Sequence, residues 1–280
     1  MVNAGARNKP FRIVIYTLLV ALSILFVVPL YWLLTNSVQT VGSASTFWPT
    51  SFRLENYKYA VTLIDYWNFA RNSIIITAIS VLIPTLTSAF VGFGFARLRA
   101  PGKNVLFLLM LSTMMLPAIV TQIPTYVIFF KIGFINTFWP WFFWALGGSA
   151  FSIFLYRQFF ATFPKDLEEA ATIDGCSTYR IFWNIFLPIS LPVIATVAIL
   201  SFNGSWGNDY ITPFMFLQND KYPLATALFS IGYVFPGQKD ITLTQVQSAG
   251  LILFVLPIIV VFFLGQRYLV EGVVSSAIKG

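Results

Sequence analysis

The amino-acid sequence predicts an all-α, polytopic membrane protein with six transmembrane helices, and three observations lead to this fold class. The first is composition. Of 280 residues, 58% are hydrophobic and 10% are charged, whereas a soluble globular protein is about 25% charged. The second is that charge is absent from six long stretches. The third is that these stretches are continuously apolar, without the alternation of membrane β-strands. Together they exclude an ordinary cytosolic enzyme, a disordered chain and a nucleic-acid-binding protein.

Each charge-free stretch is long enough for a transmembrane helix, which needs about 20 apolar residues. Helices and closed barrels are the folds that satisfy every backbone polar group in lipid. We therefore expect spans at residues 13–34, 72–96, 104–121, 138–158, 189–209 and 246–265. Prolines within or beside these stretches predict kinked helices, and they are Pro29, Pro84, Pro117, Pro124, Pro188, Pro192 and Pro257.

The first span follows Arg7, Lys9 and Arg12, so an alternative is a signal peptide cleaved near Ser43-Ala44-Ser45. The apolar core of a signal peptide is about 7–15 residues long. The stretch Ile13–Leu34 has 22 residues. We therefore expect this segment to be retained as a membrane anchor.

Basic residues predict the orientation of the chain, because they gather on the cytoplasmic side of membrane proteins. With the N-terminus inside, 11 basic residues are cytoplasmic (Arg7, Lys9, Arg12, Arg97, Arg99, Lys103, Arg157, Lys165, Arg180, Arg267 and Lys279) and 6 are outside (Arg53, Lys58, Arg71, Lys131, Lys221 and Lys239). Both termini are therefore expected in the cytoplasm. Residues 1–280 are expected to form a single transmembrane domain, with an N-terminal span at 13–34, a core at 72–265 and a cytoplasmic tail at 266–280.

The sequence offers little for catalysis on this chain. It has no histidine and a single cysteine, Cys176, which excludes histidine-dependent catalysis, the usual zinc sites and an internal disulfide. A nucleotide-binding P-loop needs Ser or Thr after Gly-Lys, but Gly102-Lys103 is followed by Asn104. We predict no catalytic residue, no metal site and no cofactor on this chain.

The predicted cytoplasmic loop at residues 159–188 has the signals of two short helices. Pro164 suits the first turn of a helix, and acidic residues follow it at Asp166, Glu168 and Glu169, where the helix dipole favours negative charge. Gly175 stands where a C-terminal cap is expected, and Ser177 can cap a second helix that leads to Pro188. The small side chains of Ala170 and Ala171 would let the backbone of another protein come close.

The spacing within this loop resembles a known family. Glu169-Ala170-Ala171, Gly175 and Ile185-Phe186-Leu187-Pro188 match the EAA loop of ABC importer permeases in identity and spacing. Further segments resemble the carbohydrate-uptake branch, and within it the smaller, six-helix permease of maltose-type importers: Tyr156-Arg157-Gln158-Phe159-Phe160, Gly204-Ser205-Trp206 with Asn208-Asp209, and Ser276-Ala277-Ile278-Lys279-Gly280. One departure is Gly207, since the family often has Ser-Trp-Asn-Asp.

The resemblance implies a type I ABC importer permease fold in a bacterial cytoplasmic (inner) membrane. It implies that the loop is a coupling helix seated in a cytoplasmic ATPase dimer, which binds ATP and Mg²⁺. The residues carried over to ATPase coupling are Glu169, Ala170, Ala171, Asp174 and Gly175, with Ile185, Leu187 and Pro188 anchoring the second helix. Further implied partners are a second homologous permease in a heterodimer, an extracytoplasmic solute-binding protein and a sugar. The alternative for the loop is a surface helix that merely joins two spans.

The end of the fifth span is the first candidate for a substrate path. Asn203, Ser205, Trp206, Asn208 and Asp209 combine amide, hydroxyl, carboxylate and aromatic groups, which a sugar requires together. Polar groups at membrane depth usually face a cavity or a partner helix. The alternative is that Asp209 is merely hydrated at the external interface. A second candidate is Gln122, with Thr121 and Tyr126. The resemblance leaves open whether the partner permease holds most substrate contacts.

The predicted function is therefore that of a permease subunit in a binding-protein-dependent ABC importer, with a sugar or oligosaccharide as substrate. One alternative is an ABC permease for another solute, such as a peptide or a polyamine. Another is an ion-coupled secondary transporter, which usually needs ionisable groups inside the membrane. Asp209 alone approaches that requirement here.

Overall fold

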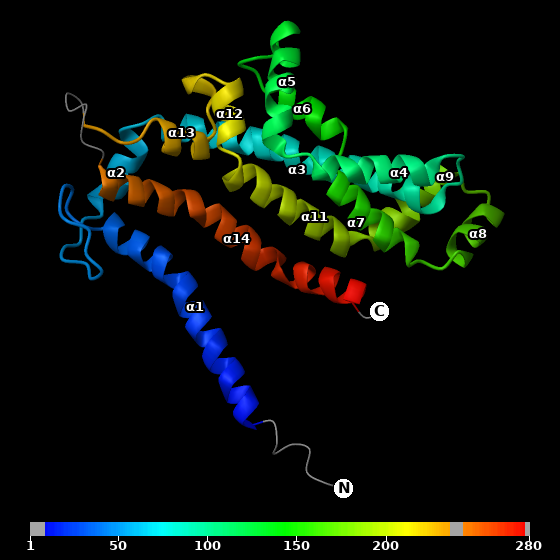
Figure 1. Cartoon of the computed structure of the whole chain (residues 1–280), viewed down its shortest axis with the longest axis horizontal. Helices are drawn as coiled ribbons and strands as arrows, with labels where there is room; N and C mark the ends of the chain where they lie inside the picture. Colours follow the sequence, from blue (N-terminus) through cyan, green and yellow to red (C-terminus); the bar gives the residue numbers. More distant parts are fainter. Residues whose placement is uncertain (1–8, 236–242, 278–280) are drawn as a thin grey trace. The chain divides into compact units, whose positions relative to one another are not determined.

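The computed structural model describes residues 9–235 and 243–277, and every regular element within them is a helix (Figure 1). The cations Arg7, Lys239 and Lys279, which entered the prediction of orientation, lie outside these residues. In chain order the elements are α1 (Lys9–Ser37), α2 (Glu55–Thr62), α3 (Tyr66–Arg97), α4 (Lys103–Ser112), η1 (Thr113–Met115), α5 (Ala118–Lys131), α6 (Trp139–Leu146), α7 (Ala150–Ala161), α8 (Asp166–Ile173), α9 (Thr178–Ile181), η2 (Phe182–Phe186), α10 (Leu187–Ile189), α11 (Leu191–Asn203), η3 (Gly204–Asn208), α12 (Ile211–Phe216), η4 (Asn219–Lys221), α13 (Leu224–Ser230) and α14 (Thr244–Ala277).

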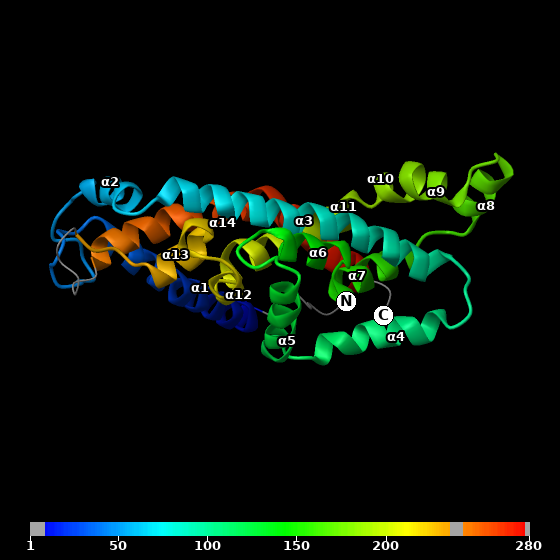
Figure 2. The same cartoon turned by 90° about the horizontal axis from the view of Figure 1, so that it is seen from above.

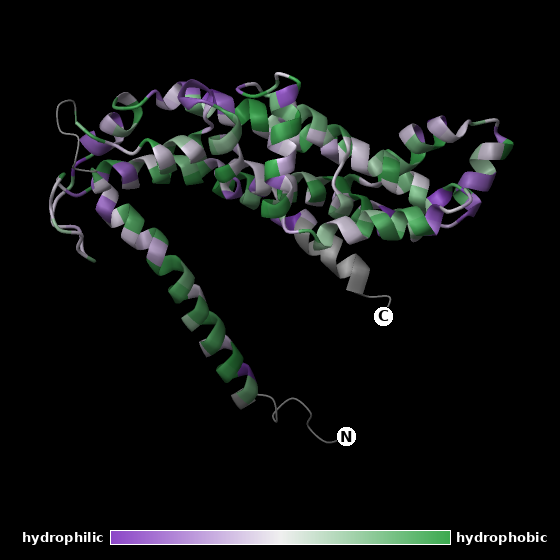
Figure 3. Ribbon diagram, turned by 45° about the horizontal axis from the view of Figure 1, so that its top comes forward, coloured by the Kyte–Doolittle hydropathy of each residue, from purple (hydrophilic) through white to green (hydrophobic). Residues whose placement is uncertain are grey.

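The chain divides into two compact units. The first unit comprises residues 1–66 and 231–255, and it contains α1. This helix is hydrophobic along almost its whole length (Figure 3), and its side chains from residue 11 to residue 30 are exposed. A helix that is apolar on all sides needs lipid or a protein partner around it. The predicted span at 13–34 lies within this helix.

Polar contacts hold the rest of the first unit together. The Asn56 side-chain amide donates to the backbone oxygens of Ser37 at 2.9 Å and Gln39 at 2.7 Å. The Tyr233 hydroxyl donates to the Ala60 carbonyl at 2.9 Å. Burial is the main cause that raises the pKa of Tyr233, with Tyr66 adding to the effect. The phenol therefore stays protonated and remains a donor at neutral pH.

The prediction of six transmembrane helices is not confirmed. Among the residues that the structure describes, three helical segments are long and apolar enough to cross a membrane, namely Phe11–Ser37, Tyr66–Arg97 and Thr244–Tyr268. Two further spans result only if bent pairs are each counted as one. One pair, Lys103–Met115 with Ala118–Lys131, bends by 100° (Figure 2), and the other, Thr178–Ile189 with Leu191–Asn208, bends by 77°. The predicted span at 138–158 is divided into α6 and α7.

Proline and glycine explain where the predicted spans break. Leu116 has an extended backbone with ψ 121° before Pro117, because a residue preceding proline is pushed away from the helical region. Gly148 separates α6 from α7 with φ +69°, a conformation that glycine adopts without steric cost. A charge-free stretch of sequence therefore fixes the apolar length but not the straightness of a helix.

The second unit, residues 67–230 and 256–280, contains a cluster of aromatic side chains. We call Phe93, Tyr156, Phe160, Phe182 and Phe186 the aromatic cluster; all are buried. They come from α3, α7 and η2, and Val193 and Val197 of α11 pack in the same core. Close ring contacts, such as Phe93 to Phe186 with centroids 5.0 Å apart, make this a tightly packed junction.

A close approach between α3 and α7 makes a first prediction possible. A Cβ atom at Gly92 would lie 2.6 Å from Tyr156 Cβ, whereas a Cβ at Gly94 would meet no atom within 4 Å. We expect Gly92→Ala to destabilise the protein by about 1–3 kcal/mol because it overpacks this contact. Gly94→Ala should instead be neutral or stabilising by up to about 1 kcal/mol, since alanine favours a helix. In detergent, Gly92→Ala should unfold at a lower temperature than the unchanged protein, whereas Gly94→Ala should not; equal shifts would contradict the close contact.

Candidate functional site

The predicted cytoplasmic loop folds as two short helices joined by a glycine turn. The first turn of α8 carries Asp166, Glu168 and Glu169, as predicted from the helix dipole. The helix begins two residues after Pro164, with Lys165 as its N-cap. In both views of the molecule α8 lies beyond the ends of α3 and α7 (Figures 1 and 2).

Gly175 ends α8 in a Schellman motif. Its φ is +79°. The Cys176 amide donates to the Ala171 carbonyl at 2.9 Å, and the Gly175 amide donates to the Thr172 carbonyl at 3.0 Å, which is the paired pattern of this cap. Ser177 then caps α9, because its hydroxyl accepts from the Arg180 amide at 3.4 Å. Both caps predicted from the sequence are confirmed.

The loop has one buried side and one exposed side. Ala171 is buried against the aromatic cluster, and Ile185 and Leu187 pack on the same cluster. Glu169, Ala170, Asp174 and Gly175 are exposed, as is Pro188. Ile173 is 85% exposed beside them. Ala171 therefore differs from the other residues carried over to ATPase coupling, since its side chain faces the interior of this unit.

Arg97 connects the last turn of α3 to the loop. Its Nε lies 2.7 Å from Glu168 Oε1 in an ion pair whose side chains are 8% and 26% exposed. Its Nη2 donates to the Phe163 carbonyl at 2.7 Å, and its guanidinium lies 5.1 Å from the centroid of Phe186. From the sequence alone, Arg97 is predicted only to be a cytoplasmic cation. No local pattern in the sequence links it to Glu168.

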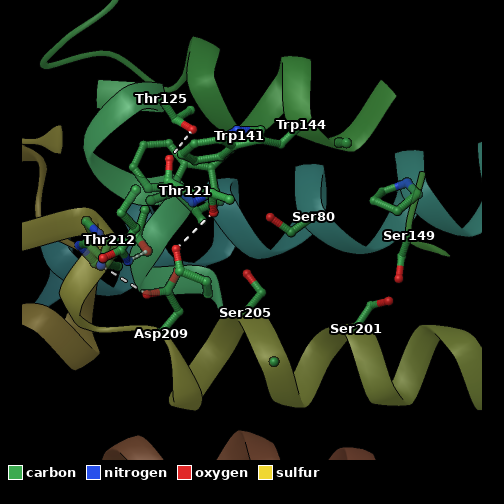
Figure 4. Close-up of a pocket in the computed structure, with 18 of the residues that line it drawn as sticks. Ser80, Thr121, Thr125, Trp141, Trp144, Ser149, Ser201, Ser205, Asp209 and Thr212 are labelled. Carbon is green, nitrogen blue, oxygen red and sulfur yellow. Dashed lines mark hydrogen bonds between the residues drawn. The ribbon is translucent and has the colours of Figure 1, made fainter. Parts of the chain in front are cut away.

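A cavity of about 420 Å³ lies within the second unit (Figure 4). Side chains from α3, α5, α6, α11, η3 and α12 line it. Its polar lining residues are Ser80, Thr121, Gln122, Thr125, Ser149, Ser201, Ser205, Asp209 and Thr212, and two tryptophans, Trp141 and Trp144, line it as well. The volume falls in the range of about 300–1,000 Å³ that is typical of small-molecule sites.

The cavity gathers some of the predicted substrate-path residues. Ser205 and Asp209 of the first candidate line it together with Gln122 of the second. Asn203, Trp206 and Asn208 are not among its lining residues. Trp206 is buried, and its ring stacks on Phe202 with centroids 5.6 Å apart. The two candidate regions for the substrate path lie far apart in the sequence, but residues from both line the same cavity.

Hydrogen bonds fix the polar end of the cavity. Asp209 Oδ1 accepts from the Thr212 amide at 3.0 Å, which stabilises the first turn of α12. Gln122 Nε2 donates to Thr212 Oγ1 at 3.1 Å and so connects α5 with α12. Ser205 Oγ lies 3.4 Å from Thr77 Oγ1 on α3. Asp209 is therefore a structural acceptor as well as a cavity-lining carboxylate.

Gly207 lies within a π-helical turn, η3 (Gly204–Asn208). A π-turn takes up one more residue than an α-helical turn, and such turns occur frequently at functional sites. The extra glycine in Gly204-Ser205-Trp206-Gly207-Asn208 coincides with this turn. Ser205 and Asp209 on either side of it still reach the cavity.

Sequence reasoning missed the aromatic side of the cavity. Trp141 and Trp144 lie on α6, which falls within the span predicted without interruption at 138–158. Ser149 follows the break at Gly148 and caps α7, accepting from the Ser152 amide at 3.5 Å. The sequence did contain a signal for the aromatic side of the cavity. Gly147-Gly148 follows a tryptophan-rich segment, and glycines that interrupt an apolar stretch indicate a broken helix.

Comparisons with known proteins agree with this geometry. A helical membrane protein with a polar cavity and a protruding capped loop has the features of a transport component. Residues 88–275 match the family described as "Binding-protein-dependent transport system inner membrane component", and the chain belongs to this family. The sequence-based resemblance to ABC importer permeases is thereby confirmed. So is the prediction that this chain is a transport subunit whose ATPase is separate.

Several relatives cover nearly the whole chain. The "Probable starch degradation products transport system permease protein AmyC" of Thermoanaerobacterium thermosulfurigenes is 31% identical over 263 residues, which are 93% of this chain and 94% of that protein. The "Melibiose/raffinose/stachyose import permease protein MelC" of Bacillus subtilis is 32% identical over 283 residues, or 99% of both chains.

The fold is also similar to that of a solved structure. One chain of a bacterial ABC transporter involved in the import of the acidic polysaccharide alginate matches with a TM-score of 0.83 and 20% identity. The match covers 96% of this chain and 99% of that chain. At this identity the likeness shows a shared fold. It supports the predicted fold class, although the number of transmembrane helices stays unconfirmed.

Proposed function

We propose that this chain is the permease subunit that moves a sugar or oligosaccharide through a bacterial inner membrane by ATP-driven alternating access. The observation that carries the proposal is the two-sided loop around α8. Its exposed side offers Glu169, Ala170 and Asp174 for contact with an ATPase. Its buried side is joined to α3 by Arg97 and to the aromatic cluster by Ala171. A displacement of α8 would therefore be transmitted to the helices that line the cavity.

The relatives support the choice of substrate class. Those described above bear the names of permeases for starch degradation products and for melibiose, raffinose and stachyose. Gln122, Ser205 and Asp209 line a cavity of suitable size. In this proposal they form part of the substrate path, whereas Asn203, Trp206 and Asn208 support it from outside the cavity.

The proposal includes the remaining partners and the orientation. The chain pairs with a second, homologous permease in a heterodimer and receives substrate from an extracytoplasmic binding protein. A cytoplasmic ATPase dimer binds ATP and Mg²⁺ and contacts α8. Both termini then lie in the cytoplasm, on the same side as the loop at 159–188. The 11 basic residues assigned to the inner side support this orientation.

Reconstitution of the whole importer tests this function. Proteoliposomes would contain the two permeases and the ATPase, with ATP and Mg²⁺ inside and the binding protein outside. We expect uptake of labelled melibiose or maltotriose that requires both ATP and the binding protein. Uptake driven by an ion gradient without the ATPase would contradict the proposal. Uptake of a peptide or a polyamine with no sugar uptake would assign the chain to another solute class.

A further inference from the structure

The charge of the cavity restricts the kind of sugar that it can hold. Asp209 is the single ionisable side chain among the described residues that line it, and no lysine or arginine lies among them. One oxygen of Asp209 already accepts the Thr212 amide. The carboxylate of an acidic sugar would enter a site that offers another carboxylate and no cation. Such a group would lose its hydration without a compensating partner.

The aromatic side of the cavity is held in a fixed orientation. The Trp144 ring meets Trp141 at 5.7 Å and 83°, Phe129 at 5.4 Å and 86°, and Phe216 at 5.3 Å and 68°. These edge-to-face contacts are favourable aromatic geometries. Trp144 is still 37% exposed, whereas Trp141 is 6% exposed. Trp144 therefore offers an open, preorganised surface, and Trp141 supports it.

The opposite side of the cavity is polar. Ser201 and Ser205 lie one turn apart on α11 and η3, facing the tryptophans across the space (Figure 4). A hydroxyl group both donates and accepts hydrogen bonds. A sugar ring has an apolar C–H face and a rim of hydroxyl groups. Trp144 matches the first surface, and the serines with Gln122 match the second.

We propose that this cavity is a binding site for an uncharged saccharide, with Trp144 as its stacking surface and Asp209 excluding acidic sugars. The inference rests on the proposed sugar-import function. It adds that this chain holds the sugar and that the sugar carries no charge. The fold does not decide this charge, because a chain of the same fold belongs to an importer of an acidic polysaccharide.

Saturation-transfer difference NMR on the complete permease–ATPase complex in nanodiscs tests the site directly. The binding protein is left out, since it would select the ligand first. The probes are melibiose, maltotriose, digalacturonate and spermidine. We expect signal from at least one neutral sugar and an apparent affinity for digalacturonate at least about tenfold weaker. Asp209 alone would attract a cation, so spermidine tests whether charge or the sugar-shaped surface decides binding; it has neither an apolar ring face nor a rim of hydroxyl groups and should also bind more weakly than the neutral sugar. Equal binding of digalacturonate or of spermidine would overturn the proposal.

Variants assign the signal to this chain. Trp144→Leu should weaken neutral-sugar binding about tenfold because it removes the aromatic surface, and Trp144→Phe should retain part of it. Trp139→Leu is the matched control, since Trp139 lies on the same helix, is 50% exposed and does not line the cavity. Unchanged binding in both Trp144 variants would place the sugar elsewhere and overturn the proposal. Co-purification with the ATPase checks that each variant is assembled.

The two proposals can fail separately. If the reconstituted importer takes up a neutral sugar but the complex gives no Trp144-dependent signal, the cavity assignment is wrong and the sugar-import function stands. If the importer takes up no sugar with ATP and binding protein present, the sugar-import function itself is wrong.

Discussion

Replacing Gly175 with valine is expected to lower co-purification of the ATPase, and ATP hydrolysis stimulated by the binding protein, at least about tenfold. Gly175 has φ +79°, and no atom would lie within 4 Å of an added Cβ. The penalty is therefore conformational rather than steric. An L-residue in this region costs about 1–2 kcal/mol, and a β-branched residue is a genuine outlier there. Valine would break the Schellman motif and redirect the exposed residues of α8.

Two matched substitutions separate this effect from general damage. Gly175→Asn should retain most of the assembly, because asparagine tolerates positive φ. Gly133→Val places a valine at positive φ in another part of the chain. Gly133 follows α5 and has φ +76°, and an added Cβ there would also meet no atom within 4 Å. The Gly133→Val variant should lower thermal stability while the ATPase still co-purifies. Normal co-purification of Gly175→Val, or equal loss with Gly133→Val, would show that α8 does not dock through this capped geometry.

The capped loop illustrates what sequence alone can predict. Acidic residues in a first turn, a glycine with positive φ and a serine N-cap act through bonds between residues a few positions apart. Their positions in the sequence were therefore enough to place α8, the turn at Gly175 and the cap at Ser177. The ion pair between Arg97 and Glu168 depends on how α3 packs against the loop. Many charged residues were equally available in the sequence, so this partnership could not be predicted.

The cavity could be predicted only in part, because it too depends on how distant segments pack together. Ser205, Asp209 and Gln122 stood out because polar residues are rare in apolar stretches. Trp144 did not, because aromatic residues are ordinary in a transmembrane helix. Its role depends on the break at Gly148, which separates α6 from α7. Hydropathy measures how apolar a segment is and not where it bends, so the six expected spans overlooked the geometry that forms the cavity.

The Arg97→Met variant is expected to uncouple transport from ATP hydrolysis. Sugar uptake by the reconstituted importer should fall about tenfold or more, while a larger share of ATP hydrolysis continues without transport. Arg97 holds three parts of the loop at once: Glu168, the Phe163 carbonyl and the ring of Phe186. Its loss should also cost about 1.5–3 kcal/mol of stability, as for hydrogen bonds to charged groups. Uptake measured per ATP hydrolysed is the decisive ratio, since a purely structural defect would lower both rates together.

Arg99→Met is the matched control, because Arg99 lies two residues further along and is exposed. It should leave the ratio of uptake to hydrolysis unchanged. A normal ratio in Arg97→Met, or the same loss in both variants, would exclude Arg97 as the connection between α3 and α8.

Glu168→Gln shows which of the Arg97 contacts matters. This variant removes the ion pair but keeps the bond to Phe163 and the contact with Phe186, so its effect should be smaller than that of Arg97→Met. Because Glu168 acts through Arg97, the double variant should match Arg97→Met rather than add to it. Exchanging the two residues should not restore coupling, since a glutamate at position 97 has no group to donate to the Phe163 carbonyl. Restoration by the exchange would mean that charge attraction alone, without the orientation set by Phe163 and Phe186, transmits the movement of α8.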